Sequence, residues 1–231
     1  MTDKSLPRGT ADNYATYYAV KGGDRNDLLA NPEVLFQTIA GEVAVLQALS
    51  RIGFDASVAR VLDVGGSSGG SLIPFFFVRS PCAHLTCVDI SEVAIKLGNA
   101  RYPGVHFLHA DARDLPFDQE FDLIYSSSIF FQNTDDDVAM AIGHEMRRVL
   151  KPGGFIVTRD WCRQRPGDRK TRAVTVKRIE KLIGLPVAFS IAGALVPPVG
   201  RLISRLAPAL YFPLRALLPL LVGQRVYVMR G

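Results

Sequence analysis

The sequence predicts an α/β protein built on a doubly wound, mostly parallel sheet. Short apolar runs of strand length, beginning with residues 59–64 and 84–90, alternate along the chain with stretches of helical periodicity. Strands separated by helices are joined by right-handed crossovers, which makes neighbouring strands parallel. Glycines or aspartates follow several of these strands. Because ligands bind at the carboxyl ends of the strands in such sheets, these residues are the first candidates for a site.

Composition limits the class of protein. A length of 231 residues fits one domain with an appendage, and 48% hydrophobic with 21% charged residues exclude a disordered or fibrous chain. The three cysteines include no CxxC pair, which excludes a disulfide scaffold and a zinc ribbon; no metal is expected. They fit a reducing compartment, so we expect a cytoplasmic protein. The N-terminus lacks an apolar core, and the longest uncharged stretch, residues 182–200, is broken by prolines and glycines, so neither a signal peptide nor a membrane span is expected.

Charge divides the chain into two unlike parts. Residues 1–158 contain 13 Lys and Arg against 19 Asp and Glu, a net charge of −6. Residues 159–231 contain 14 against 3, a net charge of +11. The basic C-terminal part is therefore expected to have a different function from the rest of the chain.

The elements follow in order along the chain. Residues 1–31 form a polar arm that contains Tyr17, and Asn31-Pro32 predicts the start of an amphipathic helix over residues 32–50. Thr134 with Asp137 three residues later predicts a capped start for a helix over 134–150. The other expected elements are strands at 59–64, 84–90, 105–111, 121–127, 155–161, 185–193 and 224–230, and helical stretches at 91–100, 172–184 and 196–222.

Three groups of residues at strand ends point to one ligand. The loop Asp63-Val-Gly65-Gly66-Ser67-Ser68-Gly69 lets backbone N–H groups approach a ligand closely, although a glycine-rich turn can also be purely structural. Asp89, 24 residues after Gly65, can accept both hydroxyls of a ribose or can cap the helix that follows. Asp111 can accept the amino group of adenine while the Ala112 N–H reaches a ring nitrogen, or Asp111 can simply form a turn.

In order, spacing and strand context, these residues resemble the successive motifs of class I S-adenosylmethionine-dependent methyltransferases. The resemblance covers residues 59–160 and includes LPF at 115–117, FDLIYSS at 121–127 and EMRRVLKPGGFIV at 145–157. It implies a Rossmann-like methyltransferase fold of seven strands with the last antiparallel, and S-adenosylmethionine as cofactor. The cofactor-binding residues that it implies are Asp63, Gly65, Gly66, Ser67, Gly69, Asp89, Ile90, Asp111, Ala112 and Ser127.

Two departures from the family pattern affect the glycine loop. Ser67 stands where the family has its middle glycine, and Pro74 requires the following helix to begin near Gly70 or Ser71. A dinucleotide-binding oxidoreductase would need the pattern GxGxxG. This chain fails that pattern at Ser67, so the methyltransferase interpretation is preferred.

The acceptor is less well defined than the cofactor. The resemblance implies that the arm 1–31 and an insert at 185–222 cover the substrate of a methyltransferase domain spanning 32–231. Position after the fourth and fifth strands makes Phe130, Asp160 and Trp161 candidate pocket residues beside Tyr17, with Asp160 a weak candidate for a general base. No Asn-Pro-Pro-Tyr segment follows the fourth strand, so nucleic acid is not the expected partner. A small molecule is expected instead (a sugar, a glycan end or a natural product), methylated on oxygen.

The insert leaves three interpretations open. Residues 196–222 are apolar with Arg201, Arg205 and Arg215 interspersed. They can form a lid over the substrate, a basic amphipathic surface for lipid headgroups, or a helical subdomain with solvated arginines. Two alternative functions stay open: a non-catalytic S-adenosylmethionine-binding protein, and a membrane-surface methyltransferase of a lipid-like substrate. The sequence does not predict the oligomeric state.

Overall fold

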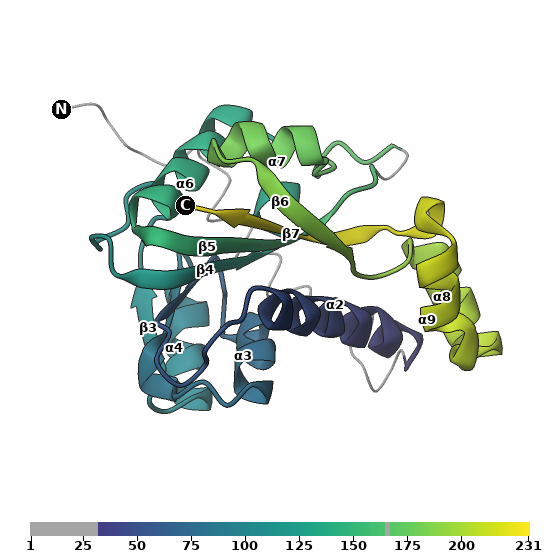
Figure 1. Cartoon of the computed structure of the whole chain (residues 1–231), viewed down its shortest axis with the longest axis horizontal. Coiled ribbons are helices and arrows are strands. Elements are labelled where there is room, and N and C mark those ends of the chain that lie inside the picture. Colours follow the sequence, from purple (N-terminus) through teal and green to yellow (C-terminus); the bar gives the residue numbers. More distant parts are fainter. Residues whose placement is uncertain (1–31, 165–166) are drawn as a thin grey trace.

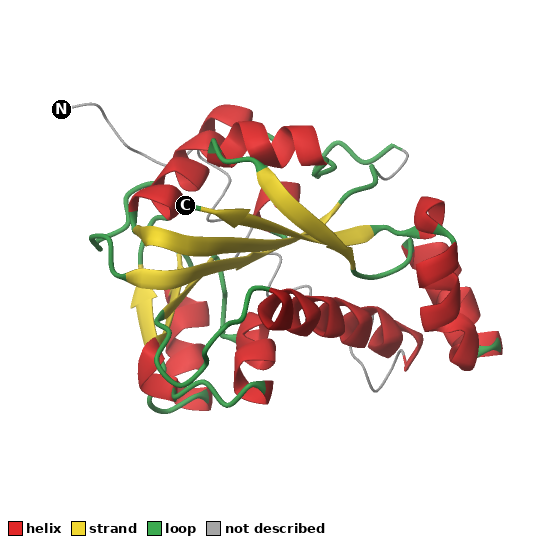
Figure 2. Ribbon diagram, in the orientation of Figure 1, coloured by secondary structure: helices red, strands yellow, loops and turns green. Residues whose placement is uncertain are grey.

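A seven-stranded sheet forms the centre of the protein, in the order β3-β2-β1-β4-β5-β7-β6 (Figure 2). The computed structural model describes residues 32–164 and 167–231, so the predicted arm with Tyr17 lies outside the described residues. Strands β1 to β5 run parallel, while β7 is antiparallel to both β5 and β6. The predicted α/β sheet and its antiparallel last strand are confirmed. The strands are β1 Val61–Val64, β2 Leu85–Asp89, β3 His106–His109, β4 Phe121–Ser127, β5 Leu150–Trp161, β6 Val187–Ala192 and β7 Gln224–Arg230.

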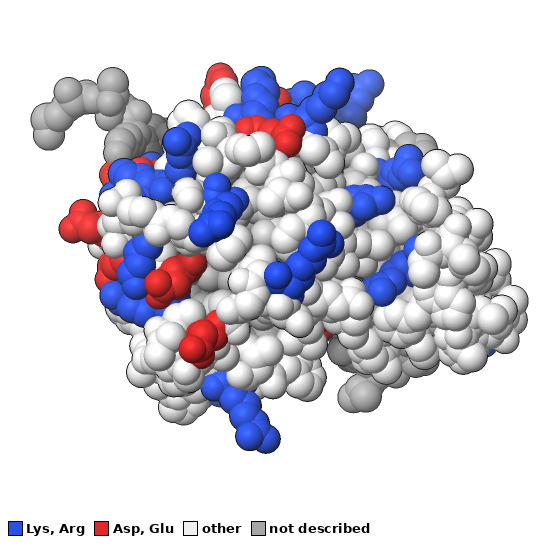
Figure 3. All heavy atoms as spheres, in the orientation of Figure 1, with Lys and Arg blue, Asp and Glu red and all other residues white. Residues whose placement is uncertain are grey.

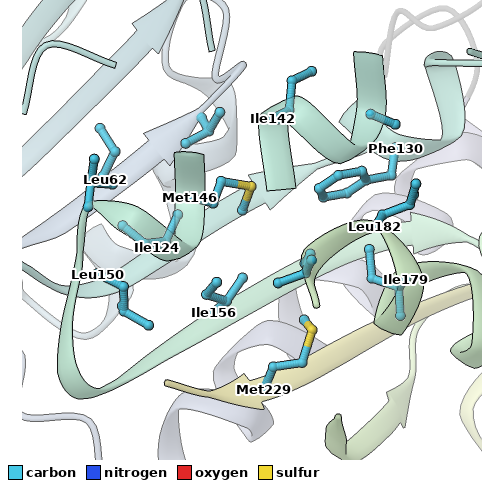
Figure 4. Packing of buried hydrophobic residues seen from close by; sticks show 14 of the residues in the cluster. Leu62, Ile124, Phe130, Ile142, Met146, Leu150, Ile156, Ile179, Leu182 and Met229 are labelled. Carbon is cyan, nitrogen blue, oxygen red and sulfur yellow. The ribbon is translucent and has the colours of Figure 1, made fainter. Parts of the chain in front are cut away.

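Helices cover both faces of the sheet, with α6 and α7 on one face and α2, α3 and α4 on the other (Figure 1). Side chains alternate between the faces along each strand. Leu62 and Ile156 therefore pack with α6 and α7, as Figure 4 shows, while Val61 and Val157 pack on the opposite side. The helices are α2 Pro32–Arg51, α3 Ile73–Phe77, α4 Glu92–Arg101, α5 Ile129–Gln132, α6 Asp136–Arg148 and α7 Val176–Ile183.

Two helix starts bear on the sequence predictions. The predicted cap at Thr134 is wrong: Asp135 is the N-cap of α6, and its carboxylate accepts from the N–H groups of Asp137 and Val138 at 2.9 and 3.3 Å. An aspartate in this position satisfies two N–H groups that have no partner within the helix. Pro74 lies in the first turn of α3, directly after a 3₁₀ turn at Gly70–Leu72, as its missing N–H requires.

The strand predicted at 185–193 is confirmed as edge strand β6, and the helical stretch predicted at 196–222 follows it. We call residues 197–221 the helical insert; it contains α8 Pro197–Leu206, α9 Tyr211–Leu217 and 3₁₀ turns at Pro208–Leu210 and Pro219–Leu221. Its buried anchor is Tyr211, which packs with Phe36 and Ala40 of α2. Within the described ranges, no helix has the length and apolar character needed to cross a bilayer.

Candidate functional site

A cavity of about 370 Å³ opens where β1, β2 and β4 end. Its position is the one expected for a ligand site in a doubly wound sheet. Eight of the predicted cofactor residues line it: Gly65, Gly66, Ser67, Asp89, Ile90, Asp111, Ala112 and Ser127. Sequence motifs that lie up to 62 residues apart therefore share one cavity.

The glycine loop turns sharply against the sheet. Gly65 and Ser67 have φ values of 69° and 55°, in the left-handed region, and the Gly65 and Gly66 N–H groups both donate to Val88 O at 2.8 and 3.2 Å. A Cβ on Gly66 would lie 2.6 Å from Cys87 Sγ and closer still to the Asp63 carboxylate. Only glycine fits there. Ser67 adopts a conformation that costs a non-glycine residue about 1 kcal/mol, which explains why the family pattern has glycine at this position.

Asp63 and Gly69, the two remaining predicted cofactor residues, do not line the cavity. Asp63 is fully buried beneath the loop, where its Oδ2 accepts a hydrogen bond from the Ser71 hydroxyl. Burial raises the pKa of this carboxyl to about 7. Gly69 faces Phe107, whose Cζ would lie 2.8 Å from an added Cβ. Both residues therefore support the loop from the side that faces away from the cavity.

Asp89 connects the loop to helix α4. Its Oδ2 accepts from Ser67 N at 2.9 Å and its Oδ1 accepts from Ser91 N at 2.8 Å. Ser91, and not Asp89, caps α4 directly, since its hydroxyl accepts from Ala94 N. Burial raises the pKa of Asp89. Because a carboxylate offers about four acceptor sites, the two N–H bonds leave capacity toward the cavity.

Asp111 has a partner that the sequence analysis missed. The guanidinium of Arg113 bonds both of its carboxylate oxygens, with Nε to Oδ1 at 3.1 Å and Nη2 to Oδ2 at 2.6 Å. The Arg113 N–H also donates to Oδ1 at 2.9 Å, which is the turn-forming geometry considered for Asp111. Both side chains line the cavity. The spacing of Asp111 and Arg113, two residues apart, is the sequence feature that could have indicated this ion pair.

Arg159 is a second cavity residue that the sequence analysis missed. Its Nη1 lies 2.6 Å from Glu42 Oε1 of α2, with the two side chains 11% and 10% exposed. Its Nε and Nη2 also donate to Ser127 Oγ at 3.2 and 3.0 Å. The only signal was its place at the end of the fifth strand. Nothing local links it to Glu42, 117 residues away.

The predicted substrate residues after β4 and β5 are not cavity residues. Asp160 is fully buried, accepts from Phe131 N at 2.9 Å, and has a pKa raised by burial to about 7. Alternation along β5 explains this placement, because Arg159 faces α2 and Asp160 then faces the other side of the sheet. Phe130 belongs to the core on that other side, and Trp161, at the last position of β5, is half-buried and packs against the edge of the same core. The side chains that do line the far wall are Ile129, Gln132, Asn133, Val138 and Ile142.

Comparison with known proteins agrees with this geometry. A family model described as a methyltransferase domain matches residues 61–154. The chain is 29% identical over 184 residues to the ubiquinone/menaquinone biosynthesis C-methyltransferase of Vibrio campbellii, covering 71% of this chain and 70% of the relative. It is 36% identical over 102 residues to a demethylmenaquinone methyltransferase of Clavibacter sepedonicus, covering 42% and 39%.

Solved structures show the same fold. A putative sarcosine dimethylglycine methyltransferase from Galdieria sulphuraria superposes with a TM-score of 0.63 at 17% identity, covering 95% of this chain and 98% of the other. A geranyl diphosphate C-methyltransferase from Streptomyces coelicolor, solved with S-adenosyl-L-homocysteine, has a TM-score of 0.59 at 16% identity, covering 81% and 77%. The matched methyltransferase domain and the methyltransferase relatives, together with the shared fold, point to a class I S-adenosylmethionine-dependent methyltransferase that uses S-adenosylmethionine as its cofactor.

Proposed function

We propose that the cavity holds S-adenosylmethionine with its adenosine between Asp89 and Ala112 and its methionine end at the glycine loop. The carboxylate of Asp89 is held by two N–H groups on one side and lines the cavity on the other, which suits a pair of ribose hydroxyls. Ile90, Val138 and Ile142 supply apolar walls for a flat ring. Asp111 and Ala112 line the cavity at the end where we place the adenine ring, and the Arg113 guanidinium fixes the Asp111 carboxylate there.

Arg159 completes the proposed cofactor site. It lines the cavity beside Ser127, next to the glycine loop, and its positive charge suits the carboxylate of the methionine end. Glu42 and Ser127 hold three of its nitrogens, so the side chain has a fixed position before the cofactor arrives. Preorganisation of this kind lowers the entropy cost of binding.

The chain's own contribution to methyl transfer is positioning. The cofactor supplies a reactive methyl group on a sulfonium sulfur. The cavity walls then hold the acceptor in line and keep water away, and alignment at about 3–3.5 Å can lower the barrier by up to about 7–11 kcal/mol. Ile129 and Asn133 of the α5 segment line the cavity beside Ser127, so they are the described residues most suited to contact the acceptor.

For the acceptor we propose a small lipophilic molecule, with the ring carbon of a quinol as the first atom to test. Two observations support this choice: Ile129 is the apolar side chain of the far wall that the adenine ring does not use, and the relatives are named as C-methyltransferases of quinone biosynthesis. Methylation on oxygen, and a sugar, glycan end or natural product as acceptor, stay predictions from the sequence. The covering roles of residues 1–31 and 185–222 also stay predictions.

The experiment has two stages. Calorimetric titration with S-adenosylmethionine, S-adenosylhomocysteine and NAD is expected to show binding of the first two only. Isotope-labelled S-adenosylmethionine is then supplied with a short-chain isoprenoid hydroquinone, and with the same compound carrying methyl groups at every open ring carbon. Product on the open ring alone supports the proposal. Product on both compounds would assign the methyl to oxygen, and loss of binding in the first stage would overturn the cofactor site itself.

We infer a reducing compartment, such as the cytoplasm, from the thiols. Cys82, Cys87 and Cys162 are all free. Cys87 lies beneath Gly66, and burial raises the pKa of its thiol, which makes it unreactive. Free thiols persist where glutathione and thioredoxin keep them reduced. Alkylation of freshly lysed cells before purification, followed by mass measurement, would show reduced cysteines if this is correct.

A further inference from the structure

The helical insert exposes an unusual amount of aliphatic surface. Leu206, Leu217 and Leu220 are 71%, 75% and 81% exposed. Exposed leucines at 202, 210 and 218 adjoin them in the same short helices and turns. A soluble monomer scatters such residues singly, whereas a continuous apolar surface marks an interaction site.

The charges of this region have one sign. Residues 185–222 contain three arginines and no aspartate or glutamate. On α8, Arg201 and Arg205 lie four residues apart, directly beside Leu202 and Leu206, so a cationic stripe borders an aliphatic one. Arg163 adds a cation next to the last turn, where its guanidinium donates to Leu220 O at 3.3 Å. Figure 3 shows the insert end of the molecule as a white surface with scattered blue and no red.

Arg205 and Arg163 are exposed and available to an external anion, whereas Arg201 is half-buried with its Nε enclosed. The ion pairs between described residues involve none of Arg201, Arg205 and Arg163. Arg215 differs, because its guanidinium turns inward to Ala40 O and Gly193 O. Tyr211 anchors the insert on the same inner side, with its hydroxyl accepting from Leu195 N at 3.1 Å. The insert is therefore fixed to the domain by one face and presents leucines and arginines on the other.

We propose that the helical insert docks the enzyme on a bilayer that contains anionic lipids. Leucine side chains enter the acyl boundary and arginines meet the headgroups, as in amphipathic helices that lie at a membrane surface. A contact with a second protein would be expected to carry aromatic residues at its centre, whereas the exposed apolar side chains here are leucines.

The position of the insert connects this surface to the cavity. Strand β6 ends and β7 begins at the end of β5, where Trp161 pairs with Gln224. Since β5 is parallel to β4 and β1, that edge of the sheet is also the one where the cavity opens. Docking would bring the cavity close to the bilayer surface. The docking proposal does not depend on the proposed acceptor, but it gives a lipophilic acceptor a short route to the site.

The test is co-sedimentation of the full chain with vesicles of phosphatidylcholine alone and of phosphatidylcholine mixed with phosphatidylglycerol. We expect binding to the mixed vesicles that weakens with added salt, and little binding to phosphatidylcholine alone. The variant Leu206→Gln/Leu217→Gln/Leu220→Gln is expected to lower the partition coefficient about tenfold or more. The variant Arg205→Gln is expected to lower it only for the mixed vesicles.

A matched control removes exposed apolar residues elsewhere. Val58, Phe77 and Leu97 are 66%, 69% and 54% exposed, and the last two belong to α3 and α4, away from the insert (Figure 1). The variant Val58→Gln/Phe77→Gln/Leu97→Gln is expected to bind vesicles like the wild type. Three results would overturn the proposal: a wild-type chain that stays in the supernatant with both vesicles, equal losses in the two triple variants, or a dimer in sedimentation velocity that only the insert variant dissociates.

Discussion

Replacing Gly66 by alanine tests the packing of the glycine loop directly. The new methyl group would lie 2.6 Å from Cys87 Sγ and closer to the Asp63 carboxylate, and both of these side chains are fully buried. Neither neighbour is the free end of a flexible side chain, so the loop itself has to move. That movement would also pull the Ser67 N–H away from Asp89 Oδ2, now 2.9 Å distant.

The size of the effect follows from this contact. Adding a methyl group to a closely packed site costs about 1–3 kcal/mol, and the rigid neighbours place Gly66→Ala near 3 kcal/mol. For a chain of this length that corresponds to a fall in Tm of roughly 6–12 °C. We also expect binding of S-adenosylmethionine to weaken about tenfold or more, because the loop and Asp89 are displaced together.

Gly70, at the start of the 3₁₀ turn directly after the loop, provides the control for stability. A Cβ added there meets no atom within 4 Å, and its φ is outside the left-handed region. Gly70→Ala is expected to change the free energy of unfolding by less than about 0.5 kcal/mol. Differential scanning calorimetry measures the change in Tm of both variants, and ligand titration measures their affinity for S-adenosylmethionine. If Gly66→Ala and Gly70→Ala behaved alike, the described packing of the loop on β2 would be wrong.

Three further predictions concern charged groups. Asp89→Ala removes a charged acceptor from the cavity and is expected to weaken S-adenosylmethionine binding by about 1.5–3 kcal/mol in calorimetric titration; unchanged affinity would refute its proposed role. Glu42→Gln leaves the Arg159 guanidinium buried without its carboxylate, so urea unfolding should show a loss of about 3–5 kcal/mol. The double variant Glu42→Gln/Arg159→Met should recover part of that loss, and no recovery would contradict the pairing. Burial raises the native pKa of Asp160 from 3.8 to about 7, so between these values the native state binds more protons than the unfolded state. Stability should therefore fall as pH rises from about 4 to about 7, and Asp160→Asn should reduce this fall in urea titrations across the range, leaving the similar contribution of Asp63. The same slope in the variant and the wild type would exclude Asp160 as a source.

The cofactor motifs could be predicted from the sequence because their signals are local. A buried strand followed by Gly65 and Gly66 specifies a tight turn, and parallel strands bring their carboxyl ends to one edge. Asp89 and Asp111 therefore had to come near the loop, whatever the details of packing. The helix positions were predictable for a similar reason, since apolar periodicity along each segment decides which face is buried.

Asp160, a candidate by its place near a strand end, does not line the cavity, and the reason is the register of β5. Neighbouring side chains on a strand point to opposite faces, so a shift by one residue separates a cavity residue, Arg159, from a core residue, Asp160. Without the pairing of β5 with β4 and β7, position near the strand end did not distinguish them.

Only the tertiary structure decided which charges meet. The pairing of Arg159 with Glu42 joins residues 117 positions apart, and it exists because α2 crosses the end of β5. The exposed aliphatic face of the helical insert is likewise a tertiary property, since one side of each short helix is buried by α2 and the other is left open. Local sequence sets periodicity and turn geometry. Whether a given face is buried or left exposed depends on segments that contact one another only after the chain has folded.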